Sequence, residues 1–381
     1  MKWEKVKLGE LYEVHNGLSK AGKFFGEGYP FLTFSTVFNN YFIPKQITDL
    51  VQSTEKEQES YSIRRGDVFV TRTSETSDEL GMSCVALKDY PMATYNGFTK
   101  RMRPITNRVF PEYIGYYMRL PSFRGEFRAF STMTTRASLR NEDLLGLEVK
   151  LPSIEIQKQI ADILSAYDDL IENNQKQIKL LKEAAQRLYK EWFVDLHFPG
   201  HENTKIVDGV PEGWRRGLLK ELISVNYGKD HKKVPDDGNI PVYGSGGLMR
   251  KCNKSLFSGE AVLIPRKGSL NNIMYVDETF WTVDTMFYAT MKQPHTAVFV
   301  YFFVKAFDMY SMNIGAAVPS MTTKILDAMD VVIPDKETLE KFDKYAKVYF
   351  NKIKTLQGQN EQLKTARDLL LPKLMSGEVE V

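Results

Sequence analysis

The sequence is poor in cysteine: its 381 residues include only Cys84 and Cys252, far apart in the chain. Two isolated cysteines provide neither a disulfide framework nor a pair of metal ligands, which favours a reducing, cytoplasmic compartment. The opening MKWEKVKLGEL lacks the apolar segment of a secretory signal. No apolar run approaches the roughly 18 residues of a membrane span, so we expect no membrane partner.

Neither sign of charge is in large excess. Lys and Arg number 51, Asp and Glu number 48, and the formal net charge is +3. This balance does not by itself indicate nucleic acid, so any basic surface has to be local. The hydrophobic fraction of 43% is ordinary for a globular protein, and the length suffices for two or more domains with their own cores.

Signatures of catalysis are missing as well. The sequence has no G-x-x-x-x-G-K-[ST] phosphate loop, no adenosylmethionine-type glycine motif and no Asn-Pro-Pro-aromatic motif. The glycines of YGSGG (243–247) do not follow the G-x-G-x-x-G order. His197 and His201 flank a Pro-Gly pair that favours a turn over a metal site, and the five histidines form no recognisable triad. We therefore predict no catalytic residues and no metal site.

The sequence does contain an internal repeat. Leu151-Pro152 recurs as Ile333-Pro334, and the match continues without a gap through the long segment that follows each proline. A second match has a different offset, because the material between the two anchors is longer in the first copy. This match relates Trp3, Leu8, Leu11 and Gly17 to Trp214, Leu219, Leu222 and Gly228. The pattern predicts a constant scaffold and a variable module, each present twice.

Both segments after the prolines are typical of long coiled-coil helices. Apolar residues recur there at alternating steps of three and four, with one four-four step around Asn174 in the first helix. Each helix would span about 40 residues, or about 60 Å. Ser153 and Asp335 are the expected caps. A narrow apolar stripe of this length needs a partner helix, which favours an antiparallel pair within the chain. Packing of each helix on its own module, or of the second helix on another chain, remains the alternative.

The predicted stripe contains two asparagines, Asn174 and Asn360, which are candidates for setting the register of the pair. Its members are Ile160, Tyr167, Leu170, Asn174, Ile178, Leu181 and Leu188 in the first helix and Phe342, Tyr349, Ile353, Leu356, Asn360, Leu363 and Leu370 in the second.

The expected fold is α+β: two modules of short strands and helices, joined by two long antiparallel coiled-coil helices and related by a pseudo-two-fold axis. We expect a first module over 1–150 and a first helix over 151–196. A linker and second module would occupy 197–332, and a second helix 333–381.

Basic residues gather locally within the modules. Residues 96–140 contain nine Lys or Arg against two acidic residues, and the second module has Lys229, Lys232 and Lys233 and the pair Arg266-Lys267. Interleaved Ser, Thr and Asn would complete a surface that contacts phosphates and base edges. A solvated face is the plainer interpretation of each cluster, but two copies on one rigid spacer favour nucleic acid.

The ordered set of motifs resembles the specificity subunit of type I restriction–modification enzymes. It comprises the W-x-x-x-x-L-x-x-L openings at Trp3 and Trp214 and the Leu-Pro-Ser and Ile-Pro-Asp entries to the helices. The segments LYKEWFVD (188–195), FPG (198–200) and LPKLMSGEV (371–379) complete the set, and the likeness covers essentially the whole chain.

This resemblance implies that each module is a target recognition domain that reads one half of a bipartite site in double-stranded DNA. The helix pair would be a conserved spacer. Two modification subunits, which carry the methyltransferase chemistry and bind S-adenosylmethionine, would dock on the chain, and restriction subunits using ATP and Mg would join them. The chain itself would bind no cofactor and perform no chemistry.

Loops that follow strands are the expected DNA contacts. In the first module these are Lys20, Lys23, Arg72, Thr73, Ser74, Asn96, Thr135 and Arg136; in the second they are Lys229, Lys232, Lys233, Tyr243, Ser245, Arg266, Lys267, Thr322 and Lys324. Two other functions stay open from the residues alone: a coiled-coil adaptor that binds proteins without DNA specificity, and an enzyme with an unrecognised site.

Overall fold

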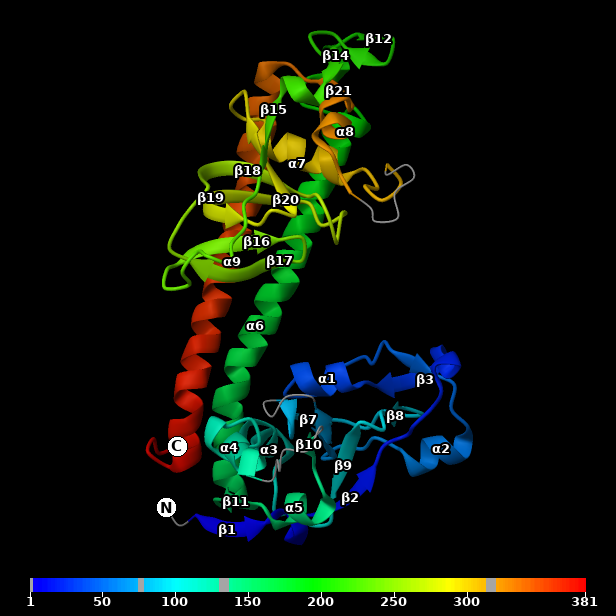
Figure 1. The fold of residues 1–381 in the computed structure, drawn as a ribbon, viewed down its shortest axis with the longest axis vertical. Coiled ribbons are helices and arrows are strands. Elements are labelled where there is room, and N and C mark those ends of the chain that lie inside the picture. The colour runs from blue at the N-terminus through cyan, green and yellow to red at the C-terminus, as the bar shows by residue number, and fades with distance from the viewer. Residues whose placement is uncertain (1–2, 75–78, 130–136, 313–319) are drawn as a thin grey trace. The chain divides into compact units, whose positions relative to one another are not determined.

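The computed structural model describes residues 3–74, 79–129, 137–312 and 320–381 (Figure 1). The chain forms two compact units. Unit 1 comprises Met1–Asn173 and Gln359–Val381, and unit 2 comprises Asn174–Gly358. Both units mix helices and strands, which confirms the predicted α+β class.

Unit 1 is built on a four-stranded antiparallel sheet of order β2-β9-β5-β7. These strands are β2 (Tyr12–Asn16), β9 (Thr99–Pro104), β5 (Val68–Thr71) and β7 (Ser83–Val85). A three-stranded sheet joins β4 (Leu50–Val51), β3 (Phe25–Leu32) and β8 (Thr94–Tyr95), and β6 (Thr73–Ser74) pairs with β10 (Ala137–Ser138). The short helices are α1 (Phe34–Asn39), α2 (Glu55–Ser60), α3 (Pro111–Tyr117), α4 (Pro121–Ala129) and α5 (Asn141–Gly146).

The core of unit 1 lies on both faces of this sheet. All four residues of β5 are buried, because alternate side chains of a strand enter opposite layers. Val68 and Val70 belong to one apolar cluster with Tyr113 of α3. Phe69 belongs to another with Leu32.

Unit 2 contains a six-stranded sheet of order β15-β20-β18-β19-β16-β17, in which only the β16–β19 pairing among these is parallel. The strands are β15 (Ile223–Tyr227), β20 (Met286–Met291), β18 (Phe257–Pro265), β19 (Met274–Thr282), β16 (Ile240–Gly244) and β17 (Gly247–Cys252). Helix α7 (Ala297–Lys305) packs against β18 and β19, α8 (Thr323–Asp327) lies later in the chain, and β12 (Ile206–Val207) forms a hairpin with β13 (Val210–Pro211).

The sequence repeat corresponds to a repeated structure. Strand β1 (Glu4–Lys7) pairs antiparallel with β11 (Glu148–Leu151), as β14 (Arg215–Leu218) pairs with β21 (Asp330–Ile333). A 3₁₀ turn follows each opening strand, at Leu8–Glu10 and Leu219–Glu221. Its glutamate, Glu10 or Glu221, accepts a hydrogen bond from the backbone N–H three residues earlier. The first and last strands of each module thus form the same scaffold.

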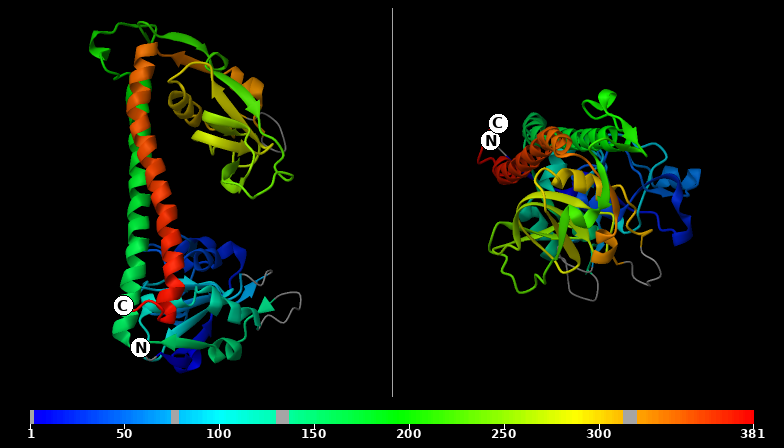
Figure 2. Two further views of the ribbon diagram at one scale, coloured as in Figure 1. Left: turned by 90° about the vertical axis from the view of Figure 1, so that its left-hand side faces the viewer. Right: turned by 90° about the horizontal axis from the view of Figure 1, so that it is seen from above.

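Two long helices accompany these scaffolds: α6 (Ile154–Tyr189), continued by a π-helical turn at Lys190–Val194, and α9 (Lys336–Ser376). Asp335 caps α9, because its carboxylate accepts a hydrogen bond from Thr338 N at 2.9 Å. The Ser153 hydroxyl accepts a longer one from Ile156 N, at 3.5 Å. Figure 2 shows the helices side by side. Among the described residues, neither these nor any other helix is long and apolar enough to cross a membrane.

Contacts within each unit confirm that the two helices are antiparallel. In unit 1 the Arg367 guanidinium pairs with Asp168, whose other oxygen accepts a hydrogen bond from the hydroxyl of Tyr116 at 2.6 Å. In unit 2 the rings of Trp192 and Phe342 lie 5.8 Å apart.

Most of the predicted stripe is buried or half-buried, including Asn174 and Asn360, at 8% and 6% exposure. Leu170 differs from the prediction, since it is 52% exposed while Ile171 is buried. The sequence reading placed the extra residue of the heptad pattern near Asn174. In the structure the shift occurs earlier, where Leu164 rather than Ile163 is fully buried.

Candidate nucleic-acid interface

In unit 1 several loops converge where β5 ends. Arg72 follows this strand directly, and its backbone N–H donates to Phe98 O at 3.0 Å. Its carbonyl accepts from Leu139 N at 2.9 Å. These bonds tie the 96–98 loop and the 137–139 segment to the strand end, so Arg72 lies at the centre of a loop cluster.

Unit 2 repeats this arrangement around Arg266, which follows β18. Its N–H donates to Thr285 O at 2.8 Å, and its carbonyl accepts from Met321 N at 3.0 Å. Leu139 and Met321 are related by the same offset as Pro152 and Pro334. Arg72 and Arg266 therefore occupy the same position in the two copies, although the intervening sequence diverged.

The Arg266 side chain is supported by aromatic rings. Its guanidinium lies 5.4 Å from the ring centre of Tyr227 and 5.8 Å from that of Phe287, and it donates to Asp284 O at 3.3 Å. Tyr227 is 53% exposed. Cation–π support of this kind fixes an arginine while leaving donors for an incoming ligand.

The glycine-rich stretch of the second module joins the same cluster. Residues 240–252 form the β16–β17 hairpin, and Ser245 O accepts a hydrogen bond from Asn272 at 2.8 Å. A Cβ on Gly268, two residues after Arg266, would lie 2.5 Å from the Ser245 hydroxyl. The structure thus brings Ser245, Arg266 and Lys267 together. Tyr243 is instead tied to Glu278 at 2.5 Å, and burial and this bond raise the pKa of its hydroxyl.

The other predicted residues of unit 2 lie on loops anchored through their backbone. Lys229 N donates to Thr282 O at 2.9 Å, and Arg250 binds the carbonyls of His231 and Val234. The side chains of Lys229, Lys232, Lys233 and Lys324 are exposed. Thr322 follows Met321 and caps α8 through Ile325 N at 3.3 Å.

In unit 1 the predicted contacts are less uniform. Lys20 pairs with Glu57 at 2.8 Å and is only 14% exposed, whereas Lys23 is exposed. Both ammonium groups lie over the Phe24 ring. The hydrogen bond from Lys20 lowers the pKa of Glu57. The Asn96 amide oxygen is used within its own turn, by Phe98 N at 2.7 Å.

Four predicted positions can be placed only partly or not at all. Thr73 and Ser74 form strand β6, whose backbone pairs with Ser138 and Ala137. Thr135 and Arg136 lie outside the described residues.

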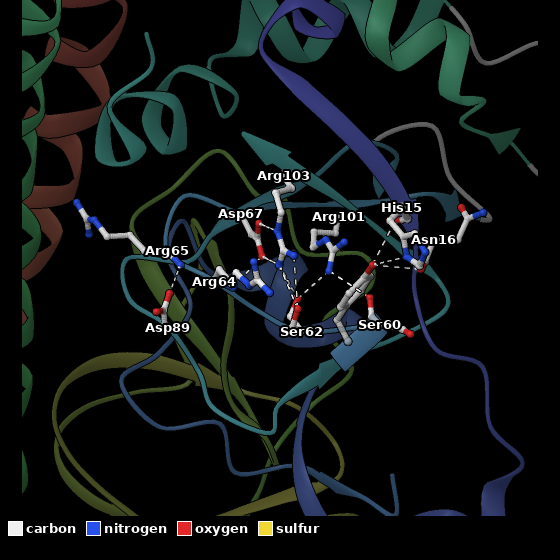
Figure 3. A network of polar contacts seen from close by, with 11 residues as sticks. His15, Asn16, Ser60, Ser62, Arg64, Arg65, Asp67, Asp89, Arg101 and Arg103 are labelled. Carbon is white, nitrogen blue, oxygen red and sulfur yellow. Dashed lines mark hydrogen bonds and ion pairs between the residues drawn. The ribbon is translucent and has the colours of Figure 1, made fainter. Parts of the chain in front are cut away.

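Several basic residues of the 96–140 segment point inward. Figure 3 shows Arg103 in a two-pronged ion pair with Asp67, at 2.8 and 2.7 Å, and Arg101 donating to Ser62 O at 2.8 Å. Arg119 is bound to the carbonyls of Ser83, Val37 and Asn40. These arginines hold loops against the sheet, so the excess of basic residues in the sequence overstates the basic surface.

Sequence reasoning did not single out Lys100. It lies on β9, is 5% exposed, and its ammonium contacts the amide oxygen of Asn141. Its alternation with the buried Met102 was the available signal, because a lysine at that register enters the sheet's core face. Among the described residues, no group of three or more His, Cys, Asp or Glu side chains could hold a metal.

Known proteins are similar to this chain over most or all of its length. Residues 1–183 and 211–365 match the family model described as type I restriction modification DNA specificity domain. The chain is 25% identical over 423 residues to the type I restriction enzyme MjaIX specificity subunit of Methanocaldococcus jannaschii, covering 100% of this chain and 94% of that protein. It is 22% identical to the HindI specificity subunit of Haemophilus influenzae, covering 99% of each.

A solved structure has a similar fold. The crystal structure of the S subunit of a type I restriction-modification system from M. genitalium aligns with a TM-score of 0.58 at 18% identity. The alignment covers 98% of this chain and 96% of that one.

Proposed function

Because the chain belongs to the type I restriction modification DNA specificity family, we propose that it recognises a specific DNA sequence within a type I restriction–modification complex. The repeated arginine position is the observation that supports this most directly. Arg72 and Arg266 stand at equivalent strand ends, each within a loop cluster of its own unit. Two equivalent arginine positions, one in each module, suit a DNA target that consists of two half-sites.

Each module would read one half-site, and the long helices would set the number of unread base pairs between them. Helix α9 has 41 residues, or about 60 Å at 1.5 Å per residue. One turn of the duplex is about 34–36 Å. A spacer of this length is therefore suited to half-sites that do not adjoin.

The methylation and cleavage chemistry would belong to partner subunits. We propose that two modification subunits, which bind S-adenosylmethionine, dock on this chain, and that restriction subunits using ATP and Mg join them in the cytoplasm. Exposed apolar side chains on the long helices, such as Leu180, Tyr345 and Val348, are suited to such docking. A protein-binding adaptor without DNA specificity is the rival function.

Arginine substitutions test the proposal. Using the full chain with its co-purified partners, Arg72→Ala and Arg266→Ala should each weaken binding of a target duplex about tenfold or more, because a base-edge contact contributes about 1–3 kcal/mol. Arg216→Ala on strand β14, an exposed arginine outside the loop clusters and the long helices, is the control. Fluorescence anisotropy measures affinity, and mapping of methylated adenines in the host genome supplies the target.

The pattern of lost specificity is equally informative. Arg72→Ala should relax recognition in one half-site only, and Arg266→Ala in the other. If the wild-type complex shows no salt-dependent binding to duplex DNA, the adaptor function is the correct one. If both variants keep wild-type affinity and target sequence, these arginines are not DNA contacts.

A further inference from the structure

Lys100 is a buried cation at the edge of the loop cluster in unit 1. Only 5% of its surface is exposed, and its ammonium donates to the side-chain oxygen of Asn141, a neutral acceptor. No carboxylate of the described residues forms an ion pair with it. Asn141 itself is exposed at the start of α5, so the ammonium lies just beneath the surface.

The charges around Lys100 do not compensate it. Burial lowers its pKa, and the nearby positive charge of Arg72 lowers it further, while Asp143 acts in the opposite direction. The Asp143 carboxylate is held by Arg140, with bonds of 2.8 and 3.0 Å. Val70 pairs with Lys100 across β5–β9, and the bond from Arg72 N to Phe98 O continues this ladder, so Arg72 and Lys100 are neighbours on one face of the sheet. Two cations thus lie side by side, and the acidic neighbour Asp143 is paired with Arg140. Burying a charge without a counter-charge is costly, and an anion from outside would remove that cost.

Unit 2 provides a comparison at the same register. Lys100 pairs across β2–β9 with Asn16, and Phe287 pairs across β15–β20 with Tyr227. Asn16 and Tyr227 each immediately precede the matching glycines Gly17 and Gly228. In unit 2 this position therefore supplies the aromatic support of Arg266, whereas in unit 1 it supplies a second cation beside Arg72.

We propose that Lys100, beside Arg72, binds one phosphodiester of the DNA backbone in unit 1, whereas unit 2 has no second cation at the matching position. This inference rests on the proposed function. The Asn141 amide, whose oxygen accepts from Lys100, would orient the ammonium toward the phosphate. Unit 1 would therefore hold its half-site with one more ionic contact at this point than unit 2.

The salt dependence of DNA binding tests the site, because each neutralised phosphate adds about 0.9 to the slope of log affinity against log salt concentration. Lys100→Met in the full chain with its partners should lower duplex affinity about tenfold at low salt and reduce that slope by about 0.9. The methylated target sequence should not change. Lys100→Arg should restore the slope. Lys5→Met on strand β1, a residue 67% exposed on another sheet, should leave it unaltered.

A purely structural lysine would behave differently. It would lower the melting temperature when replaced by Met and leave the salt slope intact, and that outcome overturns the inference. Should the Met variant fail to fold, Lys100→Gln carries the test, because its amide can still donate to Asn141 while lacking charge. If the wild-type complex does not bind duplex DNA, the proposed function is wrong. Wild-type binding with an unchanged slope in the Lys100 variants would count against this site alone.

Discussion

At the scale of single residues, Gly17 and Gly228 explain why the repeat keeps a glycine at this point. A Cβ at Gly17 would lie 2.0 Å from Asn96 O, and one at Gly228 would lie 2.0 Å from Val283 O. Each glycine lets the strand before it, β2 or β15, end directly against the backbone of a neighbouring loop. The match was visible in the sequence, but its cause is a long-range contact that no local pattern reveals.

Alanine at either glycine is therefore expected to be strongly destabilising. Gly17→Ala and Gly228→Ala should each lower the free energy of unfolding by about 2–4 kcal/mol, because the clash is with backbone that has to move. Gly125→Ala and Gly246→Ala are matched controls in the two units, since an added Cβ there meets nothing within 4 Å. Chemical denaturation monitored by circular dichroism measures the difference, and equal stabilities of all four variants would refute the steric explanation.

The candidate contacts show where residue-level prediction succeeds and fails. Arg72 and Arg266 were identified because a basic residue directly follows an apolar strand, and the structure places both in loop clusters. Arg101 and Arg103 carry the same charge but alternate into the sheet, where they bind Ser62 and Asp67. The number of basic residues in a segment does not show which face of a strand each one occupies. It therefore cannot distinguish the strand-end arginines from the arginines that point into the sheet.

At the scale of elements, the start of α9 is the best-defined helix end. The Asp335 carboxylate accepts hydrogen bonds from Thr338 N at 2.9 Å, from the Thr338 hydroxyl at 2.6 Å and from Trp214 Nε1 at 2.9 Å. We expect Asp335→Ala to lower the free energy of unfolding by about 2 kcal/mol, the upper end for a cap. Ser153→Ala at the start of α6 should cost less, since that cap is a single long bond. Equal losses for the two variants would contradict this ranking.

The same cap should give a pH dependence. Burial raises the pKa of Asp335, but hydrogen bonds from Thr338 and Trp214 outweigh it, and the net pKa is lowered. A carboxylate with a lowered folded-state pKa stabilises above its unfolded-state pKa of about 3.9, and the effect is lost as pH falls through the folded value. The stability gap between wild type and Asp335→Ala should be constant near neutrality and shrink below about pH 4. Melting curves across pH measure it; a gap unchanged in acid would show that the charge is irrelevant.

The long helices were the most predictable elements, because proline, cap and heptad spacing coincide at both starts. Their seam was less predictable. An α-helix has 3.6 residues per turn, so a heptad stripe drifts and one extra residue can be inserted at several places. Apolar residues at both Ile163 and Leu164, and at both Leu170 and Ile171, made the alternatives equivalent in the sequence. Packing against unit 1, where Leu164 joins the core with Leu371 and Leu374, decided between them.

At the scale of the whole molecule, the two copies share their anchors and differ in what lies between. The β1–β11 and β14–β21 pairs, the 3₁₀ turns and the strand-end arginines recur, whereas unit 1 divides its strands among smaller sheets and unit 2 has a six-stranded one. A repeated scaffold around divergent loops suits a family of proteins that recognise different DNA targets. The frame was predictable from the repeat. The sheets were not, since strand order depends on contacts remote in sequence.

Matched shortening of both helices tests whether they measure the target. Counting from the Trp192–Phe342 contact, the heptads 175–181 of α6 and 353–359 of α9 correspond in the antiparallel pair. Their joint deletion removes about two turns, or about 10 Å, from each helix and keeps the apolar stripe in phase. If the helices set the spacing, the recognised site should lose about three unread base pairs, at about 3.4 Å each, while both half-sites stay the same. Methylation mapping in cells that carry the shortened chain measures the gap directly.

Deletion of the heptad from only one of the two helices is the control, because it breaks the pairing between them and should abolish recognition. A shortened pair that still methylates the original spacing would show that the helices do not determine it.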